Sequence, residues 1–137
     1  MNSAPMIDLI WLAGGIHAAI VMANAPLVGK LHVKKNLAGV PAFLRQIFYV
    51  HWFYIVLVVG LFSALCFGFA PELAGGTSLG RFLSLFLATF WLLRIGLQWF
   101  YYDPEMRRQN RALDALYNVA LIFLVAVFGL AGLVPGK

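Results

Sequence analysis

The side chains of this sequence that could do chemistry are the few polar ones that interrupt long apolar segments. In hydrocarbon a polar side chain costs free energy unless it has a hydrogen-bonding or ion-pair partner, so each one indicates a partner or a ligand. Most of them lie within roughly 11 Å of one membrane edge, counting about 1.5 Å of helix per residue. We group as the predicted polar cluster Asn24, His51, Tyr54, Arg94, Gln98, Asp114 and Asn118. A further polar residue, His17, lies roughly 16 Å deep, near the membrane midplane.

The spacing of these residues places them on shared helix faces. Residues three, four or seven positions apart lie on one face of an α-helix. Such intervals separate His17 from Asn24, His51 from Tyr54, Arg94 from Gln98 and Asp114 from Asn118. An arginine at the membrane centre costs about 2.5–3.5 kcal/mol on insertion scales, so Arg94 needs a partner. We therefore expect Arg94 to point into the predicted polar cluster, with Asp114 as its acidic partner.

Three of these residues have a structural interpretation beside the functional one. Arg94 is either a structural arginine that reaches the interface and pairs with Asp114 or Asp103, or a binding group for an anionic headgroup or substrate. His51 fits an interfacial aromatic that is hydrogen-bonded to a neighbour. His17 is either a helix-to-helix hydrogen-bonding group or a candidate cofactor ligand for haem or chlorophyll.

The motifs of the common enzyme classes are missing from the sequence. It contains no G-x-S-x-G, HExxH, Walker loop, GxGxxG or CxxC, and no Asp or Glu lies deep in an apolar segment. A metal site needs three or four ligands, and only His17 and His51 are candidates for buried ones. These two differ by roughly 12 Å in depth, which makes a shared haem awkward. We therefore predict no catalytic residue and no metal site, and the sequence specifies no cofactor.

The elements that must position these residues are four long apolar segments. They cover residues 7–28, 48–69, 82–102 and 113–134, and each meets the roughly 20 residues needed to cross a bilayer. None alternates with a period of two, so helices are expected. The composition, 63% hydrophobic and 11% charged, excludes a soluble enzyme, a disulfide scaffold and a nucleic-acid module. We predict an all-α integral membrane protein with a single domain over residues 1–137, an antiparallel bundle of four transmembrane helices.

The basic residues predict how this bundle is oriented. The first and third connections carry seven of the ten Lys and Arg residues: Lys30, Lys34, Lys35, Arg45, Arg107, Arg108 and Arg111. The positive-inside rule places both connections in the cytoplasm and both termini in the periplasm of a bacterial-type inner membrane. Tyr and Trp residues gather at the same edge, as in an interfacial belt. In the third connection Asp103 and Pro104 look like a helix start, so we expect the fourth helix to begin near Pro104.

Small residues mark the opposite half of the predicted bundle. Gly14 and Gly15 are each followed by alanine four residues later, and Gly60, Ala64 and Gly68 repeat this spacing in the second segment. Small residues at this interval let membrane helices approach closely. We expect a bundle that is tight at its periplasmic end and splayed around a polar pocket toward the cytoplasm.

The size of the chain and the lack of a soluble head favour a supporting role. Our first interpretation is a structural or accessory subunit of a larger membrane complex, in contact with the lipid bilayer and other membrane subunits and not with nucleic acid. The second is a subunit that carries haem, chlorophyll or quinone in an electron-transfer or photosynthetic complex. The third is a small membrane enzyme or carrier that uses the cytoplasmic-side polar pocket.

Overall fold

The chain is built from helices, in a computed structural model that describes residues 4–133 and 135. In chain order these are α1 (Ala4–Lys30), α2 (Val33–Asn36), α3 (Ala42–Gly68), α4 (Ala70–Ala74), α5 (Ser78–Phe100), α6 (Pro104–Gln109) and α7 (Arg111–Leu133). The described residues contain no strand. Helices α1, α3, α5 and α7 are long and apolar enough to cross a membrane, which confirms the four apolar segments predicted from the sequence. Residue 134, the last of the predicted fourth segment, lies outside the described residues.

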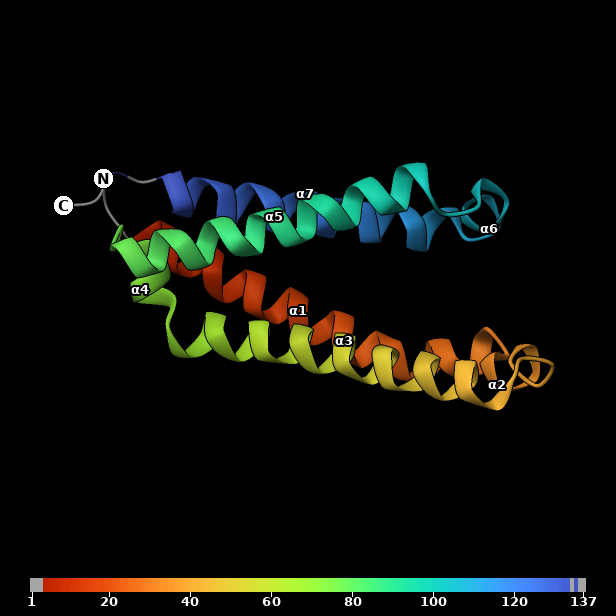
Figure 1. Cartoon of the computed structure of the whole chain (residues 1–137). Coiled ribbons are helices and arrows are strands. Elements are labelled where there is room, and N and C mark those ends of the chain that lie inside the picture. The colour runs from red at the N-terminus through yellow and green to blue at the C-terminus, as the bar shows by residue number, and fades with distance from the viewer. Residues whose placement is uncertain (1–3, 134, 136–137) are drawn as a thin grey trace.

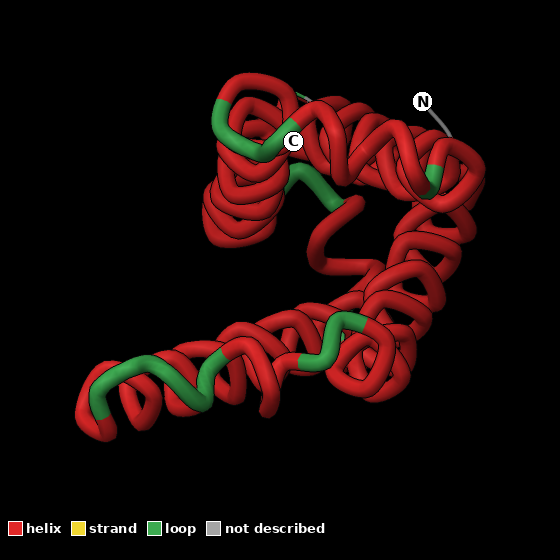
Figure 2. Tube along the Cα trace, turned by 90° about the vertical axis from the view of Figure 1, so that its right-hand side faces the viewer, coloured by secondary structure: helices red, strands yellow, loops and turns green. Residues whose placement is uncertain are grey.

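The four long helices associate as two pairs. Helix α1 packs along α3, and α5 packs along α7. The pairs meet where α1 contacts α7 and where the short α4 contacts α1, α5 and α7. Figure 1 shows α4, the start of α1 and the end of α7 on one side, with the pairs diverging toward α2 and α6 on the other. Seen from a direction turned by 90°, the helices form two groups that are joined along one side (Figure 2).

In α1 and α3 the buried residues are confined to the part of the molecule near α4, whereas in α5 burial extends to Ile95 and Gln98. In α1 the buried residues are Ile10, Ala13, Gly14 and His17, and in α3 they are Val59, Phe62, Ser63 and Cys66. No described residue is buried in residues 18–30 of α1 or 42–58 of α3. We call this part the closed half. We call the space between the pairs on the α2 and α6 side, bounded by residues 18–30, 42–58, 92–100 and 111–120, the open half.

The closed half is tight because glycines let helix backbones approach. A Cβ added at Gly14 would come within 3.0 Å of the Cys66 Cβ, and one at Gly132 within 2.6 Å of the Leu85 Cγ. At Gly80 a Cβ would collide with the backbone carbonyl oxygen of Glu72 in α4. Of the small residues singled out in the sequence, Gly14 makes such a contact, whereas an added Cβ at Gly15 or Gly68 would meet nothing within 4 Å.

The fourth long helix does not begin where the sequence indicated. Asp103 does cap a helix at Pro104, since its carboxylate accepts a hydrogen bond from the Glu105 backbone N–H at 2.9 Å. That helix, α6, ends at Gln109, and the backbone leaves the helical region at Asn110, with φ −128° and ψ 49°. Helix α7 then starts at Arg111. The expectation of one continuous helix from Pro104 is therefore wrong, because α6 and α7 are separate helices.

Candidate functional site

A polar network joins α5, α6 and α7 at the edge of the open half. The Arg94 Nη1 donates to the Gln98 Oε1 at 3.2 Å, and the Gln98 Nε2 donates to the Asp114 Oδ1 at 2.9 Å. The Arg107 Nε and Nη2 donate to the Asp114 carboxylate at 3.2–3.4 Å. Arg94 therefore reaches Asp114 through the Gln98 amide and not directly.

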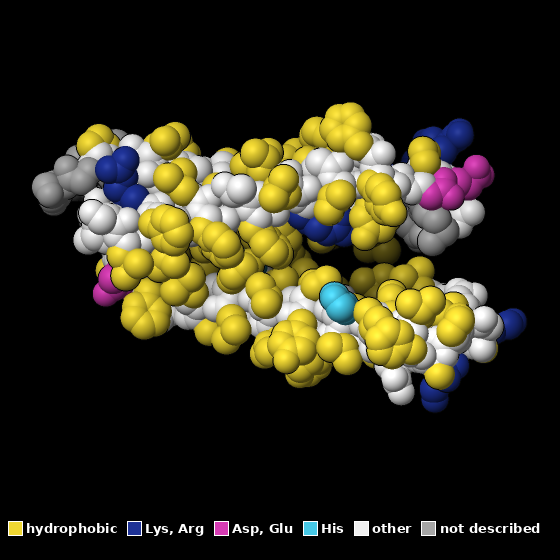
Figure 3. Space-filling model, in the orientation of Figure 1, with side chains coloured by type: hydrophobic (Ala, Val, Ile, Leu, Met, Phe, Trp, Pro, Cys, Tyr) yellow, Lys and Arg dark blue, Asp and Glu magenta, His cyan; other side chains and the backbone are white. Residues whose placement is uncertain are grey.

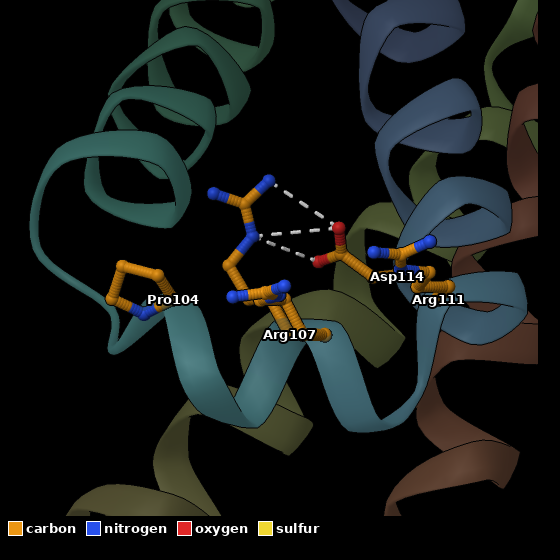
Figure 4. Close-up of a pocket in the computed structure, with 5 residues that line it drawn as sticks. Pro104, Arg107, Arg111 and Asp114 are labelled. Atoms are coloured by element: carbon orange, nitrogen blue, oxygen red, sulfur yellow. Dashed lines mark hydrogen bonds and ion pairs between the residues drawn. The ribbon is translucent and has the colours of Figure 1, made fainter.

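The ion pair of this network differs from the one expected. Asp114 pairs with Arg107, whose Nε lies 3.2 Å from the Asp114 Oδ1, and not with Arg94. Because of the break at Asn110, Arg107 lies on α6, apart from α7, and its side chain reaches Asp114 from there. In Figure 4 the Arg107 guanidinium is directed at the Asp114 carboxylate. Arg107 was not predicted as a site residue, because it was counted only among the basic residues of the third connection.

Arg94 lies between two aromatic rings. Its guanidinium carbon is 5.0 Å from the ring centroid of Tyr102 and 5.6 Å from that of Tyr117. These distances are within the range of cation–π attraction. The Arg94 side chain is half-buried, while the Gln98 side chain beside it is 9% exposed. The arrangement holds the guanidinium in one place and leaves part of it accessible.

Asn118 extends the network on α7. Its Nδ2 donates to the Asp114 backbone carbonyl at 2.7 Å, and its Oδ1 accepts from the Trp99 Nε1 at 2.8 Å. The second bond joins α5 to α7 one turn farther along α7 than the bond between Gln98 and Asp114. Four members of the predicted polar cluster, Arg94, Gln98, Asp114 and Asn118, are thus brought together.

The other three members lie on the α1/α3 pair, apart from this network. The His51 Nδ1 bonds to the Ile47 carbonyl of its own helix at 2.9 Å, and the Tyr54 side chain is exposed. The Asn24 Nδ2 donates to the Ile20 carbonyl at 2.7 Å, and its Oδ1 accepts from the Trp52 Nε1 at 3.3 Å. The expected single cluster is therefore two groups, because the helix pairs diverge at the end where all seven residues lie.

His17 forms a second polar centre, within the closed half. It is fully buried, and its Nδ1 lies 2.7 Å from the Ala13 carbonyl oxygen. The Trp91 Nε1 donates to the His17 Nε2 at 3.0 Å. An indole nitrogen can only donate, so the Nε2 accepts, and the Nδ1 carries the proton that it donates to Ala13.

The surroundings of His17 are aromatic. Its ring centroid lies 5.9 Å from that of Phe62, 5.3 Å from Trp91 and 5.9 Å from Phe128, so α3, α5 and α7 all contact this residue of α1. Both ring nitrogens have protein partners, which favours the helix-packing role over the ligand role that the sequence also left open. Sequence reasoning missed Trp91, although a tryptophan in the middle of an apolar segment needs a partner for its N–H.

Other polar side chains link the backbones of neighbouring helices. The Ser63 Oγ donates to the Gly14 carbonyl at 2.9 Å, and the Ser84 Oγ donates to the Leu73 carbonyl at 3.3 Å. The Arg81 Nε donates to the Gly132 carbonyl at 3.2 Å. These bonds join α3 to α1, α5 to α4 and α5 to α7, all in the closed half.

A basic cavity adjoins the polar network, at the turn between α6 and α7. It has a volume of about 260 Å³ and is lined by Pro104, Arg107, Arg108, Arg111 and Asp114 (Figure 4). Arg107 and Asp114 are shared by the cavity and the network. Three guanidinium groups around one carboxylate leave this end of the protein positively charged, so it suits an anion.

The described residues contain no group of three or more His, Cys, Asp or Glu side chains placed to hold a metal ion. The site is therefore an arginine-centred polar network beside an open, apolar space. Comparisons of this chain with protein-family models, with curated proteins and with solved structures find no match.

Proposed function

We propose that this chain is a small multi-pass inner-membrane protein that acts as an accessory subunit of a larger membrane complex. In this proposal the four long helices cross the membrane as an antiparallel bundle with both termini outside. The observation that carries the proposal is the open half. The two helix pairs pack against each other near α4 and leave the space between them on the other side to be filled by another membrane component.

The walls of the open half are apolar. Phe62 of α3 contacts Phe86 and Phe90 of α5, with ring centroids 6.2 and 5.1 Å away, which shows which faces of the two helices point toward each other. Seven residues from Phe62 on the same face, Ile55 is 60% exposed. Leu93 and Leu97, seven residues beyond Phe86 and Phe90, are also exposed. Apolar side chains facing each other across a space favour a helix or a lipid chain as the occupant.

The polar side chains of the closed half support an accessory role over a cofactor-bearing one. Those of His17, Trp91, Ser63 and Ser84 bond to other helices, so their hydrogen-bonding capacity is used to hold the protein together. A haem or chlorophyll ligated by His17 would have to displace Trp91 from the Nε2. The third interpretation, an enzyme or carrier that uses the polar pocket, is favoured only by the accessible part of Arg94.

The proposed orientation predicts which side of the membrane the chain ends occupy. A reporter fused to the C-terminus should be active in a form that works in the periplasm and inactive in a form that works in the cytoplasm, because seven of ten basic residues lie in the first and third connections. The same reporters inserted at Asn36, in α2, serve as the matched control and should give the opposite result. Cytoplasmic activity at the C-terminus would contradict the orientation.

The accessory role predicts a protein neighbour in the open half. A photo-crosslinking amino acid at Ile55 should capture a specific membrane protein in cells, because this side chain faces the open half. The matched control is the same amino acid at Leu12, an exposed residue of α1 beside the buried core. We expect a discrete cross-linked product at Ile55 and not at Leu12. Equal, diffuse labelling at both positions would contradict the proposed role.

A further inference from the structure

We propose that Arg94 binds the phosphate group of an anionic phospholipid whose acyl chains lie along the α5 and α7 wall of the open half. This inference rests on the proposed function in taking the four long helices to span a membrane, and it places the lipid on the wall opposite Ile55 of α3. It is carried by the juxtaposition of a positioned guanidinium without a carboxylate partner and an apolar surface directly beside it.

The charge of Arg94 is not balanced by a carboxylate among the described residues. The ion pair that these residues form joins Arg107 to Asp114, so the acid of the network is already matched. Arg94 itself donates one bond, to the neutral Gln98 amide. A guanidinium has five N–H donors, and a phosphate accepts two of them at once in a parallel geometry. Arg94 therefore retains both the charge and the donors that an anion requires.

The Arg94 guanidinium is held in position for binding. The rings of Tyr102 and Tyr117 lie 5.0 and 5.6 Å from its central carbon. The Gln98 amide that it contacts is fixed in turn by its 2.9 Å bond to Asp114. A side chain that is already ordered loses little further entropy when a ligand binds, so positioning of this kind favours affinity.

The depth of Arg94 fits the phosphate level of a membrane leaflet. It lies six residues before the end of α5 at Phe100, about 9 Å along the helix axis. A long arginine side chain extends from that depth to the interface, where lipid phosphates lie. Gln98 and Trp99 lie one turn nearer the end of α5. Tryptophan is enriched at the membrane–water interface, so these residues indicate the same interface level.

The surface beside Arg94 favours a lipid over a free anion. Leu93 is 66% exposed and Leu97 is 52% exposed, and both are on the face of α5 that points toward α3. A free phosphate would gain nothing from these side chains, whereas two acyl chains would cover them. In Figure 3 a basic side chain of the upper helix group borders the hollow between the two groups. Yellow apolar side chains form the walls of this hollow. The basic cavity at Arg107, Arg108 and Arg111 adds attraction for anionic headgroups at the same membrane edge.

The proposal is tested by native mass spectrometry of the full-length protein in neutral detergent. Dioleoyl-phosphatidylglycerol should bind about tenfold more tightly than zwitterionic dioleoyl-phosphatidylcholine, because the choline ammonium of the latter offsets the phosphate charge that Arg94 attracts. Arg94→Gln should weaken phosphatidylglycerol binding far more than phosphatidylcholine binding, and so remove most of this preference. The matched control is Arg45→Gln, which removes the same charge from α3 at the same membrane edge and should keep the preference.

Two further measurements keep the proposal testable if Arg94→Gln fails to fold. Tyr102 is half-exposed and lies at the start of the connection after α5. Tyr102→Leu removes one ring beside Arg94 and should weaken phosphatidylglycerol binding about threefold, because an exposed cation–π contact is lost. Excess inorganic phosphate should not displace the lipid. Displacement by phosphate would assign the site to a free anion, and a preference that survives Arg94→Gln would overturn the site itself. Because these measurements use the isolated protein, they stand apart from the cross-linking at Ile55, which tests the proposed function.

Discussion

Replacing Trp91 with alanine should destabilise the protein by about 3–5 kcal/mol, the range for removing a large buried aromatic side chain. Trp91 is 2% exposed and contacts Phe90 as well as His17, so its loss leaves a cavity where all four long helices meet. The variant also leaves the buried His17 Nε2 without its donor. Unfolding by SDS titration in mixed micelles measures the change.

Two control variants separate packing from hydrogen bonding at this position. Trp91→Phe keeps most of the ring volume and removes the N–H, so it should cost only about 1 kcal/mol, in line with hydrogen bonds between membrane helices. Trp11→Ala removes a tryptophan that is 49% exposed on α1 and should change the stability by less than about 1 kcal/mol. If Trp91→Ala is no worse than Trp11→Ala, His17 and Trp91 do not form the centre of the packing.

Replacing Gly80 with alanine should also destabilise the protein strongly, by about 3 kcal/mol. A Cβ at this position would collide with the Glu72 backbone carbonyl, so α4 and the first turn of α5 must move apart. Overpacking of this kind costs about 1–3 kcal/mol, and the upper end applies because the opposing atom is backbone and cannot rotate away. The matched control is Gly96→Ala on the same helix, where an added Cβ meets nothing within 4 Å and no loss of stability is expected.

The Gly80 variant should also change the separation of the two helix pairs. Spin labels at Asn36 of α2 and Gln109 of α6, both exposed, report the distance across the open half by pulsed electron resonance. The buried Cys66 is first replaced by alanine so that it is not labelled. We expect a shifted or broadened distance distribution for Gly80→Ala and an unchanged one for Gly96→Ala. An unchanged distribution in both would mean that α4 does not set the angle between the pairs.

The helices and their approximate limits were predictable because apolar length is a strong signal. The predicted segment 48–69 falls almost entirely within α3, Ala42–Gly68, and the other three agree as closely. The errors came from polar sequence at the helix ends. Residues 105–109 are good helix formers, but Asn110 is a weak helix former of a type that often follows a helix end, so the local sequence did carry a signal for the break.

The candidate site was partly predictable. Helical spacing predicted that Arg94 lies beside Gln98 and Asp114 beside Asn118, because residues within one helix have fixed relative positions. Contacts between helices depend on rotation and on crossing angles, so the Arg107 pair with Asp114 and the Trp91 bond to His17 were missed. His51 and Tyr54 were expected beside Arg94 because depth was estimated along each helix, and depth alone says nothing about lateral separation.

The arrangement of the helices in two pairs has a consequence for how the protein is made. Each pair is contiguous in the chain, since α1 and α3 are joined by the short α2 connection, and α5 and α7 by the α6 connection. Contacts that are local in sequence form early, and a chain emerging from the ribosome completes its N-terminal part first. We therefore expect the α1/α3 hairpin to enter the membrane as a unit before α7 has been translated. Association of the second hairpin then completes the protein, when Trp91 reaches His17 across α1 and α5.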